Sequence, residues 1–99
     1  MKKLFAIYDS KAEAWNDPMT FRTTAEAIRS FEQVCNDKTT QFFLYPADYT
    51  LFELGGYDDE TGTICPHSAK ISLGLSQDFK KQGLRSAPEM DDLMPNKGL

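Results

Sequence analysis

The sequence has no long apolar run. None of its hydrophobic stretches approaches the roughly 20 consecutive apolar residues that a membrane-spanning helix needs. The opening Met1-Lys2-Lys3 is followed by only five apolar residues before Asp9, which is too short for the core of a secretory signal. We therefore expect a cytoplasmic protein with reduced thiols and no membrane partner.

Groups that carry out catalysis are also scarce. The 99 residues include one histidine, His67, and two cysteines, Cys35 and Cys65. These supply only three of the about four ligands that a structural zinc ion takes. A Cys65–His67 nucleophile pair would lack a third group to orient it. No phosphate-cradling glycine motif, Gly-x-Ser-x-Gly or His-Glu-x-x-His is present. The sequence therefore predicts a protein that is not an enzyme, with no metal site and no cofactor.

Lysine and arginine are absent from residues 39–69, where acidic residues gather instead. That window holds Asp48, Glu53 and the run Asp58-Asp59-Glu60. The formal net charge of −4 argues against tight nonspecific coating of a phosphate backbone, which depends on neutralising cations. Lysine and arginine flank the window on both sides, so a local basic face is compatible with the composition.

The chain does contain a series of short β-type runs. The expected strands are residues 4–8, 19–22, the hairpin arms at 49–54 and 63–65, and a further short strand at 71–75. Residues 41–45, ended by Pro46, are interpreted as a strand or an extended edge segment. Residues 11–15 are interpreted as a surface loop or one short turn. In the hairpin, Gly62 is expected to take a positive φ in the turn, and Gly55-Gly56 to mark a bulge or a close backbone contact.

One amphipathic helix is expected to begin after Thr23 and to end at residues 36–38. Thr23 and Glu26 form a capping-box pattern, in which each side chain satisfies a backbone amide of the other residue. The apolar side chains then recur on one stripe, at Ala27, Ile28, Phe31, Val34 and Cys35. The predicted fold class is α+β, with this one main helix packed on one face of a small, largely antiparallel sheet. We expect a single domain over residues 1–80 and a flexible tail over residues 81–99.

Two surfaces are candidates for binding. Proteins that bind single-stranded nucleic acid stack bases on exposed aromatic rings beside basic side chains. An indole is unusual in a polar segment without a partner, which singles out Trp15. The candidate nucleic-acid-binding residues are Lys2, Lys3, Lys11, Trp15, Arg22 and Arg29. The competing interpretation places most of the aromatic rings in the core or in a dimer interface, because a small domain needs large apolar groups. A second candidate surface is the acidic turn formed by Asp58, Asp59 and Glu60, which could contact a basic protein partner.

Three blocks of the chain also resemble a known family. They are residues 4–14 (LFAIYDSKAEA), 25–31 (AEAIRSF) and 48–55 (DYTLFELG), the last leading into 57–62 (YDDETG). In this order they resemble the small nonstructural protein of gokushovirus-type microviruses, phages with circular single-stranded DNA genomes. The resemblance runs from about Lys3 to Lys81. It implies a protein that acts in the cytoplasm of the infected bacterium, is absent from the virion, and serves single-stranded DNA synthesis and packaging.

The resemblance brings no active site with it. The leading hypothesis is therefore a non-enzymatic phage accessory protein, a homodimer that binds single-stranded DNA or a replication protein. The alternative is an acidic interaction module that acts on a phage replication initiator or a host replication protein without touching DNA.

Overall fold

The computed structural model describes residues 1–81 of the chain, so the tail expected over residues 81–99 lies, apart from Lys81, outside the described residues. The strands are β1 (Lys2–Asp9), β2 (Ala14–Trp15), β3 (Met19–Phe21), β4 (Tyr49–Asp58) and β5 (Thr63–Leu75). The helices are α1 (Thr24–Cys35), α2 (Gln41–Leu44) and α3 (Ser76–Phe79).

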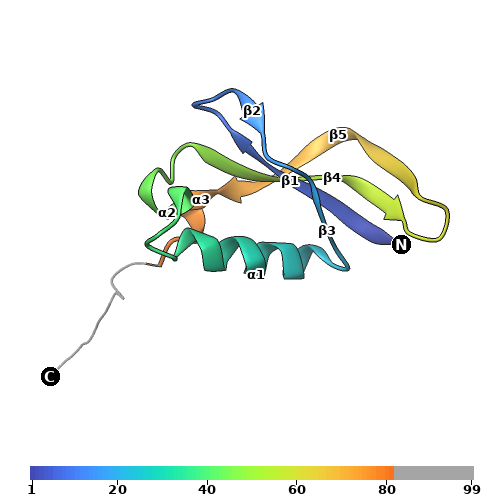
Figure 1. Ribbon diagram of the computed structural model, residues 1–99, viewed down its shortest axis with the longest axis horizontal. Helices are drawn as coiled ribbons and strands as arrows, with labels where there is room; N and C mark the ends of the chain where they lie inside the picture. Colours follow the sequence, from blue (N-terminus) through green and yellow to red (C-terminus); the bar gives the residue numbers. More distant parts are fainter. Residues whose placement is uncertain (82–99) are drawn as a thin grey trace, which may run out of the picture.

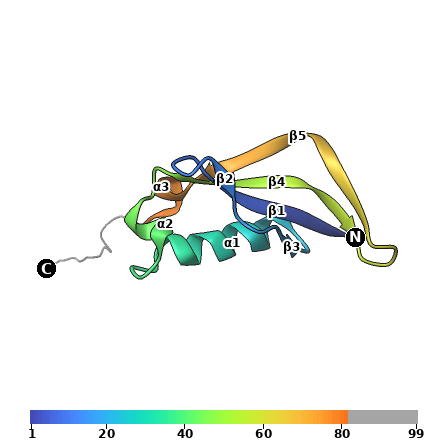
Figure 2. The ribbon, with the colours of Figure 1, turned by 45° about the horizontal axis from the view of Figure 1, so that its top comes forward.

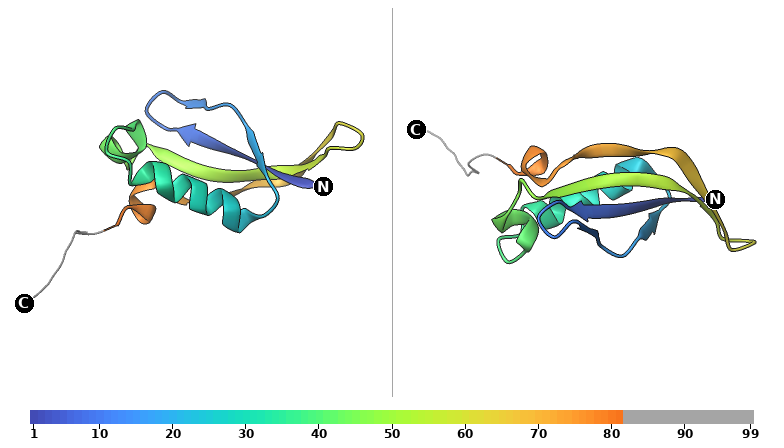
Figure 3. Two further views of the ribbon diagram at one scale, coloured as in Figure 1. Left: turned by 60° about the horizontal axis from the view of Figure 1, so that its bottom comes forward. Right: turned by 90° about the horizontal axis from the view of Figure 1, so that it is seen from above.

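The five strands form one antiparallel sheet in the order β2-β1-β4-β5 (Figure 1). β3 also pairs with β1, beside its beginning, whereas β2 pairs with its end. Seen from above, β5 runs along one edge of this sheet (Figure 3). The predicted antiparallel sheet is confirmed, and so is its hairpin of β4 and β5.

Helix α1 covers one face of the sheet, beneath β1 and β4 (Figure 2). Phe5, Ile7 and Leu51 alternate along β1 and β4 toward this face and are buried against Phe31 and Cys35 of α1. The helix begins as the sequence predicts, since the Thr23 hydroxyl accepts from the Glu26 amide at 3.1 Å. The Glu26 carboxylate, however, accepts from the amide of Arg22 at 3.0 Å. The expected single helix is only partly correct, because two short helices accompany it.

The prediction of an extended segment at residues 41–45 is wrong. Thr40 caps a helical turn there: its hydroxyl accepts from the Phe43 amide at 3.2 Å and donates to the carbonyl of Val34 at 2.6 Å. The capped turn, α2, packs the Phe42 ring between those of Phe31 and Tyr49. A short apolar run fits a helical turn packed on the core as well as a strand, and the cap decides between them.

The separate strand expected at residues 71–75 is the second half of β5, which continues beyond a large bulge. Gly55 pairs with Pro66 and Glu53 with Ile71, so the four residues from His67 to Lys70 lie opposite Leu54 alone. The bulge crosses Gly55 closely, which confirms the expected close backbone contact there. Gly62 has a φ of 75°, as expected for the hairpin turn. In residues 11–15 the chain turns and then enters β2.

A hydrogen-bonded chain links the bulge to the beginning of α1 on the helix side of the sheet. The buried Glu53 carboxylate binds His67 Nε2 at 2.8 Å and accepts from the Thr24 hydroxyl at 2.9 Å. The Thr24 oxygen in turn accepts from Lys3 Nζ at 3.2 Å. The bond to His67, with smaller contributions from Thr24 and Lys3, holds the pKa of Glu53 below its ordinary value although burial opposes this.

We expect Glu53→Gln to destabilise the fold at pH 7 by about 1–3 kcal/mol, because a hydrogen-bonded buried charge is lost. Because the pKa of Glu53 is lowered in the folded state, the stabilisation by its ionised carboxylate is complete above the ordinary carboxyl pKa of 4.5. It is lost as the pH falls through the lower value of the folded protein. Urea unfolding at pH 7 and pH 3 should show a gap between the two proteins that narrows in acid. A gap of equal size at both pH values would contradict the prediction.

Candidate nucleic-acid interface

The face of the sheet opposite α1 exposes an aromatic cluster, formed by Tyr8 of β1, Trp15 of β2 and Phe52 of β4. The Trp15 ring lies 4.9 Å from that of Tyr8 and 5.1 Å from that of Phe52, centroid to centroid. Trp15 remains 42% exposed. We call this surface the open face. It offers a flat, accessible ring that neighbouring aromatic side chains hold in place.

The β1–β2 turn places Trp15 on the open face. The Asp9 carboxylate accepts from the amides of Lys11 and Ala12, at 3.0 and 3.2 Å, and so closes the turn. Glu13 takes a φ of 56° before β2 begins. The returning strand pairs Trp15 with Tyr8, which puts both side chains on the same side of the sheet.

The bulge in β5 brings a cation to this cluster. Lys70 Nζ lies 5.8 Å from the centroid of the Trp15 ring, within the roughly 6 Å range of a cation–π contact. The strand alternation of β1 also puts Lys2 on the open face, with Tyr8 six residues further along, a distance of about 20 Å. The open face therefore carries Lys70 beside the ring cluster and Lys2 at the other end of β1 from Tyr8.

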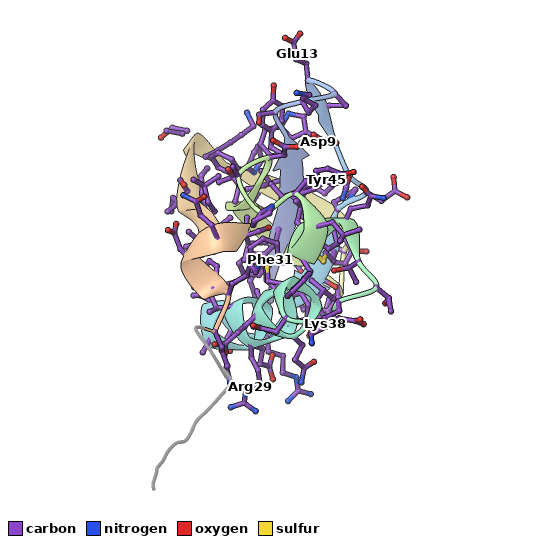
Figure 4. The ribbon with its side chains drawn as sticks, turned by 90° about the vertical axis from the view of Figure 1, so that its left-hand side faces the viewer. Asp9, Glu13, Arg29, Phe31, Lys38 and Tyr45 are labelled. Atoms are coloured by element: carbon purple, nitrogen blue, oxygen red, sulfur yellow. The ribbon has the colours of Figure 1, made fainter. Side chains whose placement is uncertain are left out.

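The structure does not gather the other predicted basic residues around Trp15. Lys3 points to the helix side, where it donates to Thr24. Arg22 is exposed between β3 and α1, and Arg29 extends from α1 away from the sheet (Figure 4). Lys11 lies in the β1–β2 turn. Of the six residues proposed from sequence, Trp15 and Lys2 share the open face.

The acidic turn lies at the tip of the β4–β5 hairpin. The Asp58 carboxylate accepts from the Glu60 amide at 3.0 Å, and this bond lowers the pKa of Asp58. The amino group of Met1 lies 3.7 Å from the Asp59 carboxylate. The Asp58 carboxylate therefore stabilises the turn itself, while Asp59 and Glu60 remain exposed. Its role in partner binding stays a prediction.

The remaining candidate groups are the histidine and the two cysteines. Cys65 is exposed, and His67 has the carboxylate of Glu53 as its partner. Cys35 is buried, which raises the pKa of its thiol. Within residues 1–81, no three His, Cys, Asp or Glu side chains lie close enough together to hold a metal ion. None of the helices in the same part of the chain is long and apolar enough to cross a membrane.

Sequence reasoning missed Phe52 and Lys70. Phe52 alternates with the buried Leu51 and Glu53 in a well-marked strand, so its position on the opposite face was available from the period of two. Lys70 had no such signal. It reaches Trp15 because the bulge offsets the second half of β5, and the register of a bulge depends on close packing between two strands.

Comparison with known proteins gives one result. A family model described as Phage ORF5 protein matches residues 2–79. No curated protein and no solved structure matches the chain significantly.

Proposed function

The chain belongs to the Phage ORF5 protein family, and from this premise we propose that it is a phage accessory protein that binds single-stranded DNA through the open face. The observation that carries the proposal is the 42% exposed Trp15 ring, held between Tyr8 and Phe52 with Lys70 beside it. Genome synthesis or packaging is the process in which we expect this binding to act.

The arrangement suits unpaired bases. An exposed ring stacks on any base, because every base presents a π face, and the stacking requires bases that are not already paired. Lys2 and Lys70 can each meet a phosphate. The acidic net charge and the small number of cations on this face favour a modest, reversible affinity over dense coating of the genome.

The test is fluorescence titration of a labelled oligothymidylate. Replacing Trp15 with alanine should weaken binding about 5-fold to 150-fold, since stacking contributes about 1–3 kcal/mol per base. Two phosphate contacts predict a slope of log K against log salt of about −1.4, and Lys70→Ala should reduce that slope by about half.

Matched controls lie on other surfaces. Tyr45→Ala removes a 55% exposed aromatic ring near α2, and Arg29→Ala removes a cation on the far side of α1. Both variants should bind the oligonucleotide like the unaltered protein. Absence of binding at low salt, or an equal loss with Tyr45→Ala, would overturn the proposal.

The finer expectations drawn from the sequence stay predictions. They are the gokushovirus type, the host cytoplasm, absence from the virion, a homodimer, the lack of an enzymatic activity, and the alternative in which the acidic turn binds a replication protein. One structural feature is compatible with self-association. Within residues 1–81, β5 has a partner strand on only one of its edges.

A further inference from the structure

A pocket of about 400 Å³ opens at the end of the molecule where the β1–β2 turn, α2 and the start of β4 meet. Figure 4 looks onto this end, where Asp9 and Tyr45 lie near one another. The polar and aromatic side chains of its wall are those of Asp9, Lys11, Gln41, Tyr45, Asp48 and Tyr49. The volume lies within the range of small-ligand sites. The pocket is separate from the open face, because none of the aromatic cluster lines it.

The wall of the pocket contains a tyrosine hydroxyl that is free to bind a ligand. Tyr49 is only 9% exposed, and its ring packs on that of Phe42 at 4.7 Å. Within the described part of the chain, its hydroxyl forms no hydrogen bond. Burial, and then the nearby carboxylates of Asp9 and Asp48, raise the pKa of Tyr49. Among the described residues, the Ser76 hydroxyl is the buried side-chain group without a partner, so the Tyr49 oxygen remains accessible from the pocket. A ligand group can replace the water that would otherwise meet it.

The carboxylates of Asp9 and Asp48 can also accept further hydrogen bonds. Asp9 uses one oxygen, Oδ1, to close the β1–β2 turn. The backbone carbonyl of Asp48 accepts from Ser10, which fixes the position of this residue. Among residues 1–81, neither carboxylate lies within 4 Å of a basic side chain. The pocket therefore presents negative charge to a group that would enter it.

We propose that this pocket binds the guanidinium group of an arginine in a basic segment of a protein partner. Carboxylates accept the paired N–H groups of a guanidinium, which is planar and carries five donors. The Tyr49 oxygen can accept one of these donors while its own proton turns toward a carboxylate. The exposed Tyr45 ring offers a surface on which the guanidinium plane can stack.

The chemistry of the pocket favours arginine over its alternatives. A nucleic acid would bring phosphates to two carboxylates opposed by the single cation of Lys11, and like charges repel. A lysine ammonium is a compact point charge that lacks the planar shape for stacking and paired hydrogen bonds. The site would thus let the protein hold a basic partner at one end while the open face remains free.

The test is an NMR titration of the whole chain with N-acetyl-arginine amide, with the citrulline analogue as a neutral control of the same shape. We expect saturable shifts of the amides of Asp9, Asp48 and Tyr49, with a dissociation constant in the millimolar range. The citrulline compound should bind at least tenfold more weakly. Asp48→Asn, which removes the charge and keeps the shape, and Tyr49→Phe, which removes only the hydroxyl, should each weaken arginine binding at least threefold.

Trp15→Ala serves as the control variant and should bind the arginine compound unchanged, because Trp15 lies on the open face. Equal binding of arginine and citrulline, or unchanged binding by Asp48→Asn, would overturn the proposal. So would shifts of the pocket amides on addition of oligothymidylate that the arginine compound competes away, since the occupant would then be a nucleic acid. Failure of the arginine titration leaves DNA binding by the open face unaffected, so the two proposals fail separately.

Discussion

Replacement of Gly55 with alanine is expected to destabilise the protein by about 3 kcal/mol, at the upper end of the cost of overpacking. A Cβ atom at this position would overlap the carbonyl oxygen of Cys65, and would lie 2.7 Å from Pro66 Cα and 3.0 Å from the His67 nitrogen. All three atoms belong to the backbone of β5, so no side chain can rotate away. The two strands would have to separate at the start of the bulge.

Gly56→Ala is the matched control, one residue further along the same strand. The nearest atom to its added Cβ would be Met1 Sδ at 3.3 Å, on a flexible and largely exposed side chain. This variant should change the free energy of unfolding by less than about 1 kcal/mol, since a tolerated Gly→Ala substitution also restricts the unfolded chain. Urea unfolding measures both variants. Equal effects of the two substitutions would show that the bulge does not cross Gly55 closely.

The same experiment bears on function, because the bulge positions both His67 and Lys70. His67 meets Glu53 on the helix side, and Lys70 meets Trp15 on the open face. A shift of the bulge therefore disturbs the His67–Glu53 hydrogen bond and the proposed interface together. For Gly55→Ala protein that remains folded, we expect weaker oligothymidylate binding than for Gly56→Ala.

Local signals in the sequence were sufficient for much of the fold. The short β-type runs of β1 and β4, the turn residues before Gly62 and the Thr23 cap each act over a few residues, and each indicated the correct element. The two predictions that were wrong depend on more than local signals. The apolar character of residues 41–45 is compatible with a strand and with a helical turn alike. The Thr40 cap distinguishes the two, and the prediction of an extended segment did not use it. The continuity of β5 depends on how a four-residue bulge packs against Gly55, which no local pattern encodes.

The candidate interface was predictable only in part, for a similar reason. The unusual context of Trp15 identified the central ring, but sequence neighbours such as Lys11 and Arg22 do not become spatial neighbours on a folded sheet. The cation that does reach the ring, Lys70, is 55 residues away and lies in the bulge of β5. The pocket that includes Tyr49 is likewise assembled from three separate segments. Surfaces of this kind follow from topology, which the charge pattern alone does not determine.

The second large effect is expected at Phe31, whose replacement with alanine should cost about 3–5 kcal/mol. Its side chain is buried at 2% exposure and meets the ring of Phe42 at 6.1 Å and that of Phe79 at 5.4 Å, both edge to face. These contacts connect α1 with α2 and α3. Removing the ring leaves a cavity and also separates the two short helices from the main one, so both losses add to the cost.

Two further variants separate this role from a general loss of hydrophobic surface. Phe31→Leu keeps most of the volume and should cost less than about 1.5 kcal/mol. Leu44→Ala, at a 55% exposed position of α2, should change stability by less than about 0.5 kcal/mol. Because α2 also forms a wall of the pocket through Gln41, Phe31→Ala should weaken arginine binding more than oligothymidylate binding. An equal loss of affinity for both ligands, in protein that is still folded, would contradict the role of Phe31 in positioning α2 and α3.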